Sequence, residues 1–166
     1  FKFMLKSSCC SDIFDYLVLA EESCYREPIV SAISLLSFAE IAVKKIYNQY
    51  SFRIHSDWSL KEMLDNQDFA ELINTHILKK FYEVNTKANY LLEYYGDLNE
   101  DYQEEYVLQV LEDTYIIAYW FYSSFNLGDC LFEEFRPPTS YYYGYDDDFI
   151  NDIFNEYSKV RSNQNY

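Results

Sequence analysis

Glycine and proline are scarce in this sequence, with three of each among 166 residues. The short strands of a β-sandwich or barrel normally end in such turn residues, so their scarcity argues against an all-β fold. Long apolar runs are also missing, because none reaches the roughly 18 residues that cross a bilayer. Hydrophobic residues nevertheless make up 49% of the chain, which is too many for a disordered protein. We therefore expect an all-α fold with a substantial core.

Basic residues are few as well. The 13 Lys and Arg residues stand against 28 Asp and Glu residues, which gives a formal net charge of -15. Affinity for the phosphate backbone depends mainly on Lys and Arg, so direct nucleic-acid binding is not expected. The charge is uneven, because residues 1–87 carry 10 basic and 12 acidic side chains (-2), whereas residues 88–166 carry 3 and 16 (-13). This excess of negative charge either keeps the protein soluble or forms a surface that binds a basic partner.

Residue types that hold metals or perform catalysis are sparse. Neither His55 nor His76 has a second histidine or a cysteine at ligand spacing, so a zinc or di-iron site is not expected. The isolated glycines form no phosphate-binding loop and no Gly-x-Ser-x-Gly elbow. No C-x-x-C pair occurs, so we expect reduced, buried or incidental thiols at Cys9, Cys10, Cys24 and Cys130. We expect a soluble, cytoplasmic protein with no cofactor, no metal and no membrane contact.

Hydrophobic periodicity predicts a helical bundle over residues 1–136. Four long helices are expected, one starting near Ser11 and the others at about 29–50, 75–93 and 100–125. The 29–50 helix is apolar or small nearly all round, which predicts a central position. Between it and the third long helix, Ser59 is expected to cap a short helix, and a second short turn follows at 69–73.

The chain after residue 136 differs in composition. Pro137 and Pro138 end the regular part, because two consecutive prolines remove two backbone donors. Residues 137–145, rich in proline and tyrosine, are predicted to form a linker, and residues 146–166 a short amphipathic helix and tail. The apolar face of that helix either folds back onto the bundle or binds a partner through Ile150, Ile153 and Phe154.

Residues 88–135 contain no Lys or Arg. Adjacent carboxylates on the fourth long helix point about 100° apart, so they do not converge as a catalytic or metal-binding pair must. They form an acidic stripe instead, with Tyr102 and Tyr106 assigned to the apolar stripe of the same helix. The predicted partner-binding acidic face consists of Glu100, Asp101, Glu104, Glu105, Glu112 and Asp113.

The order of these elements, with particular stretches, resembles a HEPN-like helical domain of the type found near the N-terminus of type I restriction R subunits. The stretches that carry the resemblance lie at 12–21, 28–47, 60–69, 115–121 and 135–138. Members of this type typically carry the motif Arg-x-x-Gly-Asn-x-x-x-His late in the third long helix. The resemblance implies that its Arg and His are the polar pair of the active ribonucleases in the family, and that a homodimer forms through the helices that carry the motif.

This sequence departs from that motif. Aligned on Asn89, it places Asn85 at the arginine, Ala88 at the glycine and Glu93 at the histidine. The cation that would bind the scissile phosphate and the group that would move the proton are both missing. The negative charge of Glu93 would also repel RNA, and it would repel a second copy of this chain. The resemblance therefore implies a HEPN-like scaffold without nuclease activity and without catalytic residues.

Three hypotheses for function follow. The first is a non-catalytic interaction module in a bacterial or phage defence-related system, which binds a basic protein through the acidic face or the final helix. The second is an acidic inhibitor that imitates DNA and occupies the basic cleft of a nuclease, restriction enzyme or CRISPR effector. The third is a HEPN-like ribonuclease with a relocated active site.

Overall fold

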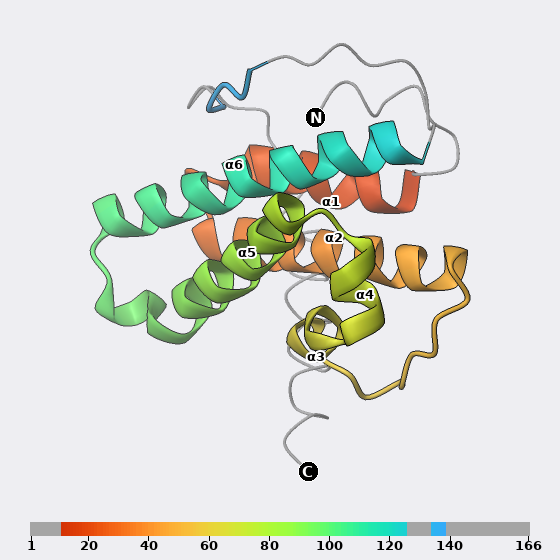
Figure 1. Cartoon of the computed structure of the whole chain (residues 1–166). Helices are drawn as coiled ribbons and strands as arrows, with labels where there is room; N and C mark the ends of the chain where they lie inside the picture. Colours follow the sequence, from red (N-terminus) through yellow and green to blue (C-terminus); the bar gives the residue numbers. More distant parts are fainter. Residues whose placement is uncertain (1–10, 126–133, 139–166) are drawn as a thin grey trace.

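The structure is a computed structural model that describes residues 11–125 and 134–138. These residues form α-helices without any strand, which confirms the predicted all-α fold (Figure 1). No helix in this part of the chain is long and apolar enough to cross a bilayer. The elements in chain order are α1 (Ser11–Ser23), α2 (Pro28–Gln49), α3 (Leu60–Asp65), α4 (Gln67–Leu72), α5 (Thr75–Tyr94), the short 3-10 helix η3 (Tyr95–Asp97) and α6 (Glu100–Ser124).

Helix α2 occupies the centre, as its all-round apolar pattern predicted. Of its 22 residues, 14 are buried, and it contacts α1, α3, α5 and α6. Small side chains let α1 approach closely, and the Ser31 hydroxyl donates a hydrogen bond of 2.9 Å to the backbone oxygen of Ala20. Because the buried hydroxyl is hydrogen-bonded, it does not cancel the free energy gained by burying the apolar side chains around it.

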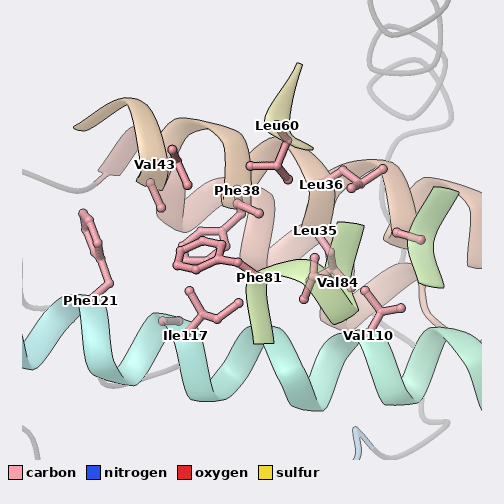
Figure 2. Packing of buried hydrophobic residues seen from close by; sticks show 14 of the residues in the cluster. Leu35, Leu36, Phe38, Val43, Leu60, Phe81, Val84, Val110, Ile117 and Phe121 are labelled. Carbon is pink, nitrogen blue, oxygen red and sulfur yellow. The ribbon is translucent and has the colours of Figure 1, made fainter. Parts of the chain in front are cut away.

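The main core lies between α2 and the antiparallel pair of α5 and α6. Phe38 of α2, Phe81 and Val84 of α5, and Val110 and Ile117 of α6 are all fully buried. Figure 2 shows Phe38, Phe81 and Ile117 close together in the space between α2 and α6. This packing fixes how α5 and α6 lie against α2, and with it the direction in which their outer faces point.

Side-chain caps set where several helices begin. Ser59 and Glu62 form a reciprocal capping box at α3, which confirms Ser59 as the predicted cap. Asn66, Asn74 and Asn99 each accept a backbone N–H at the starts of α4, α5 and α6. Each cap satisfies one of the backbone donors that a helix start leaves free.

The C-terminal end of α2 holds the two short helices in place. The Tyr47 hydroxyl donates to the backbone oxygen of Met63 in α3 at 2.7 Å, and its ring stacks on Phe69 of α4 at 5.3 Å. The Tyr82 hydroxyl of α5 donates to Asp65 at 2.6 Å. Helices α3 and α4 are therefore anchored to α2, and α3 also to α5.

Residues 134–138 return to the bundle. The Tyr25 hydroxyl donates to the backbone oxygen of Pro138 at 2.7 Å, and the Phe135 ring lies 5.5 Å from that of Tyr115. The start of the predicted linker thus packs beside the α1–α2 turn. The rest of the linker and the predicted final helix with Ile150, Ile153 and Phe154 lie outside the described residues.

We expect Tyr47→Phe to lower the free energy of unfolding by about 1 kcal/mol, because the substitution removes the donor to the Met63 carbonyl and keeps the buried ring. Tyr50→Phe is the matched control, since that ring is 50% exposed. It should change stability by less than about 0.5 kcal/mol. Urea unfolding of the three proteins compares them, and equal stabilities would contradict a contribution from this hydrogen bond.

Candidate functional site

Carboxylates gather in the N-terminal half of α6, where the sequence predicted them. Asn99 caps this helix, and Glu100 and Asp101 lie in its first turn, where negative charge stabilises a helix. Five of the six predicted side chains are exposed. The acidic surface of this protein consists of these five, Glu100, Asp101, Glu104, Glu105 and Glu112.

The acidic surface has no basic counter-charge among the described residues. Within residues 11–125 and 134–138, none of its five carboxylates forms an ion pair with a lysine or arginine. Helix α6 itself contains no basic residue. Among the described residues, no Lys or Arg side chain pairs with these carboxylates, so solvent and salt screen their negative field.

The charge of Glu27 acts on the same tyrosine as the charge of Glu100. Burial raises the pKa of Tyr95, and the charges of Glu27 and Glu100 raise it further, so both carboxylates lie near that ring. Burial likewise raises the pKa of Cys24 to about 12, with smaller contributions from Glu21 and Glu104. The Cys24 thiol therefore stays protonated and unreactive.

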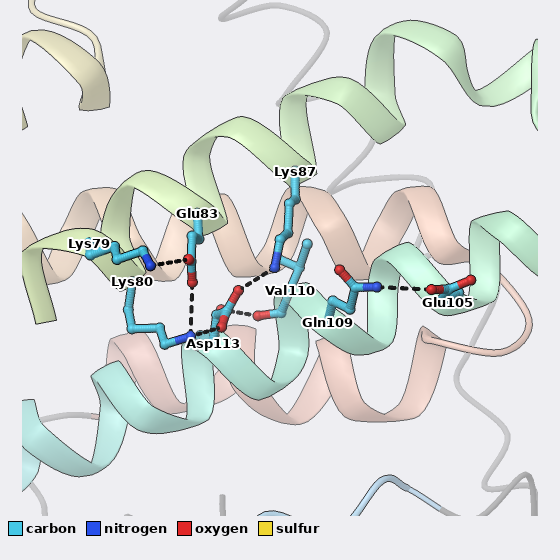
Figure 3. Close-up of polar contacts among 9 residues, drawn as sticks. Lys79, Lys80, Glu83, Lys87, Glu105, Gln109, Val110 and Asp113 are labelled. Atoms are coloured by element: carbon cyan, nitrogen blue, oxygen red, sulfur yellow. Dashed lines mark hydrogen bonds and ion pairs between the residues drawn. The ribbon is translucent and has the colours of Figure 1, made fainter. Parts of the chain in front are cut away.

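Asp113 does not belong to the acidic surface, and its predicted solvent-facing position is wrong. Its side chain is buried, with a residue exposure of 4%. It accepts hydrogen bonds from Lys80 at 2.6 Å and from Lys87 at 2.9 Å, both on α5 (Figure 3). Two lysines from a neighbouring helix compensate the charge of a carboxylate that lies on the inner side of α6.

Glu83 extends this ion-pair network on α5. Lys80 donates to Glu83 at 2.8 Å, and this hydrogen bond lowers the pKa of Glu83, aided by the charges of Lys80, Lys87 and Lys79. Burial acts to lower the pKa of Lys80, but its hydrogen bonds to Asp113 and Glu83 outweigh burial and raise it. The network links α5 to α6 through charged groups that are mostly shielded from water.

The three degenerate motif positions lie four residues apart along α5. The Asn89 amide donates to the backbone oxygen of Asn85 at 2.7 Å and to its side-chain oxygen at 3.2 Å, while Glu93 is exposed. Asn85 and Asn89 thus bond to each other within one helix. Neither amide titrates, so neither can replace the missing arginine or histidine in acid–base chemistry.

The histidines lie away from these positions. His76 is exposed in the first turn of α5, 13 residues before Asn89, which is about 20 Å along a helix. His55 is exposed in the loop after α2, with its ring 4.8 Å from that of Trp58. In the described part of the chain, no group of three or more His, Cys, Asp or Glu side chains is placed to hold a metal ion.

A tyrosine-lined groove lies between α5 and α6, beside the acidic surface. It has a volume of about 410 Å³ and is lined by Thr86, Lys87, Tyr90, Tyr102, Glu105, Tyr106 and Gln109. Tyr102 is 54% exposed, so its assignment to the inward stripe of α6 is wrong. The core face of the helix begins at Val107, and Tyr102 lies near the α5–α6 connection, where the phenol group reaches water.

The sequence carried a signal for this groove. Tyr90 and Tyr94 are four residues apart on one predicted helix, and Tyr102 and Tyr106 are four apart on the next. Residues at this spacing share a helix face, and a short connection makes the two helices antiparallel neighbours. The spacing in the sequence could therefore have predicted that these four tyrosines lie close together.

No protein-family model, curated protein or solved structure matches this chain. A functional conclusion must therefore come from its own residues. Three features are available on the outer faces of α5 and α6: the acidic surface, the tyrosine-lined groove and the altered motif positions.

We expect Asp113→Asn to lower the free energy of unfolding by about 2–3 kcal/mol. This loss is smaller than the loss for a fully buried ion pair, because the Lys80 and Lys87 side chains keep some contact with solvent. Glu112→Gln is the matched control at the next residue, which is exposed, and it should change stability by less than about 0.5 kcal/mol. Urea unfolding at neutral pH measures both, and similar effects would contradict a special role for Asp113.

The Glu83 contribution should depend on pH. Because the folded protein lowers the pKa of this carboxyl from 4.5, its stabilising effect is complete above pH 4.5 and is lost as the pH falls through the folded value. Glu83→Gln should therefore destabilise the protein more at pH 7 than at pH 3. Parallel unfolding curves at the two pH values test this, and an equal loss at both would refute the ionic contribution.

Proposed function

We propose that this chain is a non-catalytic protein-interaction module that binds a basic partner through the acidic surface. The observation that carries the proposal is the set of five exposed carboxylates that have no ion-pair partner in the described residues. A folded protein gains no stability from such a concentration of like charge, and the repulsion weakens the compact state. A basic surface on another molecule would relieve that repulsion and would be steered toward it at low salt.

The same charge favours a different protein over a second copy as the partner. A two-fold symmetric contact through this face would bring the carboxylates of one subunit against the same carboxylates of the other. Like charges opposed at an interface are costly. The homodimer that the HEPN-like resemblance implies would therefore need another face, and the defence-related setting of this proposal rests on that resemblance alone.

We propose a non-catalytic function because the residues at the positions of the HEPN-like motif cannot perform its chemistry. Asn85 and Asn89 offer no titrating group, and Glu93 places an exposed negative charge where RNA would approach. Lys87, the nearest basic residue on that helix, already donates to Asp113 at 2.9 Å.

The DNA-mimic hypothesis is the second candidate, and it shares the acidic surface. A mimic needs carboxylates spaced regularly along an elongated face, as phosphates are spaced along DNA. On α6 the exposed carboxylates fall between Glu100 and Glu112, and the helix from Thr114 to Ser124 carries none. This grouping at one end of the helix favours a discrete contact patch over an imitation of duplex DNA.

The test is affinity capture from the native host with the whole chain, followed by identification of the bound protein. Glu104→Lys with Glu105→Lys should weaken binding of that protein at least about tenfold, because like charges then face the basic partner. Raising the salt concentration should weaken binding of the unmodified chain as well. Asp113 is left unchanged, since reversing its charge would break the network with Lys80 and Lys87.

The matched control is Asp57→Lys with Glu71→Lys, which changes the net charge equally on another part of the surface. Glu71 accepts an amide hydrogen bond from Gln67 just as Glu105 accepts one from Gln109, so the local losses are similar. Equal binding by both double variants would contradict the proposal. Cleavage of RNA by the purified chain would support the relocated ribonuclease site instead, and competition with duplex DNA for the captured protein would support the DNA mimic.

A further inference from the structure

The groove between α5 and α6 presents aromatic faces to solvent. The Tyr90 and Tyr106 rings stack across the two helices, with centroids 5.2 Å apart and an interplanar angle of 24°. The Tyr94 ring lies 4.8 Å from the Tyr90 ring, and Tyr102 also lines the groove and is 54% exposed. Ring faces carry partial negative charge and attract cations that approach within about 6 Å.

The polar groups of the groove leave one carboxylate available. Glu105 lines the groove and accepts a hydrogen bond from Gln109 at 3.1 Å, but it has no ion-pair partner in the described residues (Figure 3). Lys87 also lines the groove, but its ammonium group is held by Asp113 at 2.9 Å. The available charge at the groove wall is therefore negative, and it lies beside π-faces.

We propose that this groove binds an arginine side chain of the basic partner, with the guanidinium plane against a tyrosine ring and its N–H groups donating to Glu105. This inference rests on the proposed function and specifies which side chain the partner inserts. Arginine suits the site better than lysine, because guanidinium is planar, stacks on aromatic faces and pairs with a carboxylate through two parallel hydrogen bonds. A nucleobase could also stack here, but its phosphates would meet the acidic surface.

Binding of short labelled peptides to the full chain tests the proposal. The probe is a fluorescein-labelled glycine–serine peptide that carries two arginines, compared with peptides that carry two lysines or two citrullines. Citrulline has nearly the shape of arginine but no charge, and lysine has the charge without the plane. Fluorescence anisotropy should give an affinity for the arginine peptide at least about fivefold above that for either of the others.

The tyrosine contribution is tested by three substitutions. Tyr102→Leu removes an aromatic face and should weaken binding of the arginine peptide roughly 2- to 30-fold, the range of one cation–π contact. Tyr102→Phe keeps the ring and should bind within about twofold of the unmodified chain. Tyr50→Leu is the matched control at a ring that is similarly exposed, at 50%, and lies outside the groove, so it should have no effect. Circular dichroism confirms that each variant is folded.

The outcomes separate this inference from the proposed function. If Tyr102→Leu binds the arginine peptide as well as the unmodified chain while Glu104→Lys with Glu105→Lys does not, the groove inference is overturned and the acidic surface remains. Equal binding of arginine and lysine peptides also overturns it, as does failure of the unmodified chain to bind any of the peptides. The proposed function then stands or falls on capture of the basic partner.

Discussion

The burial of α2 is the constraint on which the other elements depend. Its stripe of apolar and small residues lets α1 approach on one side, while Phe38 packs against α5 and α6 on another. Tyr47 at its end holds α3 and α4 through a hydrogen bond and a stacked ring. Because nearly every other helix contacts α2, its burial determines which faces of α5 and α6 point outward.

The position of α5 on α6 is specified further by Asp113. Apolar packing fixes a separation but tolerates small shifts along the helix axes, whereas two hydrogen bonds from Lys80 and Lys87 require one alignment. This alignment brings Tyr90 opposite Tyr106 and places Glu105 at the wall of the same groove. The network therefore supports the arrangement of the candidate binding site, and Lys87 belongs to both, because it lines the groove and donates to Asp113.

Most of the fold could be predicted because its signals are local. The ends of the three longest helices lie within one residue of the predicted ones. Asn74 and Asn99 cap two of these helices, and the Ser59 capping box marks the start of the short helix α3. The concentration of carboxylates in the N-terminal half of α6 could also be predicted, because charged residues can be counted along the sequence. Five of the six acidic residues chosen for the candidate site are exposed as predicted.

The two errors concern contacts between helices. Asp113 looks like its exposed neighbour Glu112 in the sequence, and only the approach of Lys80 and Lys87 from α5 makes its burial favourable. Tyr102 fits an apolar stripe by periodicity, yet the core face of α6 begins at Val107. Periodicity gives the direction of a side chain around its own helix, but it does not say how far along that helix a neighbour covers it.

The sequence by itself determined the helical class, the helix ends, the central place of α2 and the acidic character of the second half, because caps, periodicity and charge are properties of single segments. Tertiary structure decided that Asp113 pairs with two lysines while its exposed neighbours form no ion pair in the described residues, and that tyrosines from α5 and α6 meet in one groove. Pairing and burial depend on side chains that arrive from another helix. The positions of those side chains are set by how their helices pack against α2, and no single segment of the sequence specifies that packing.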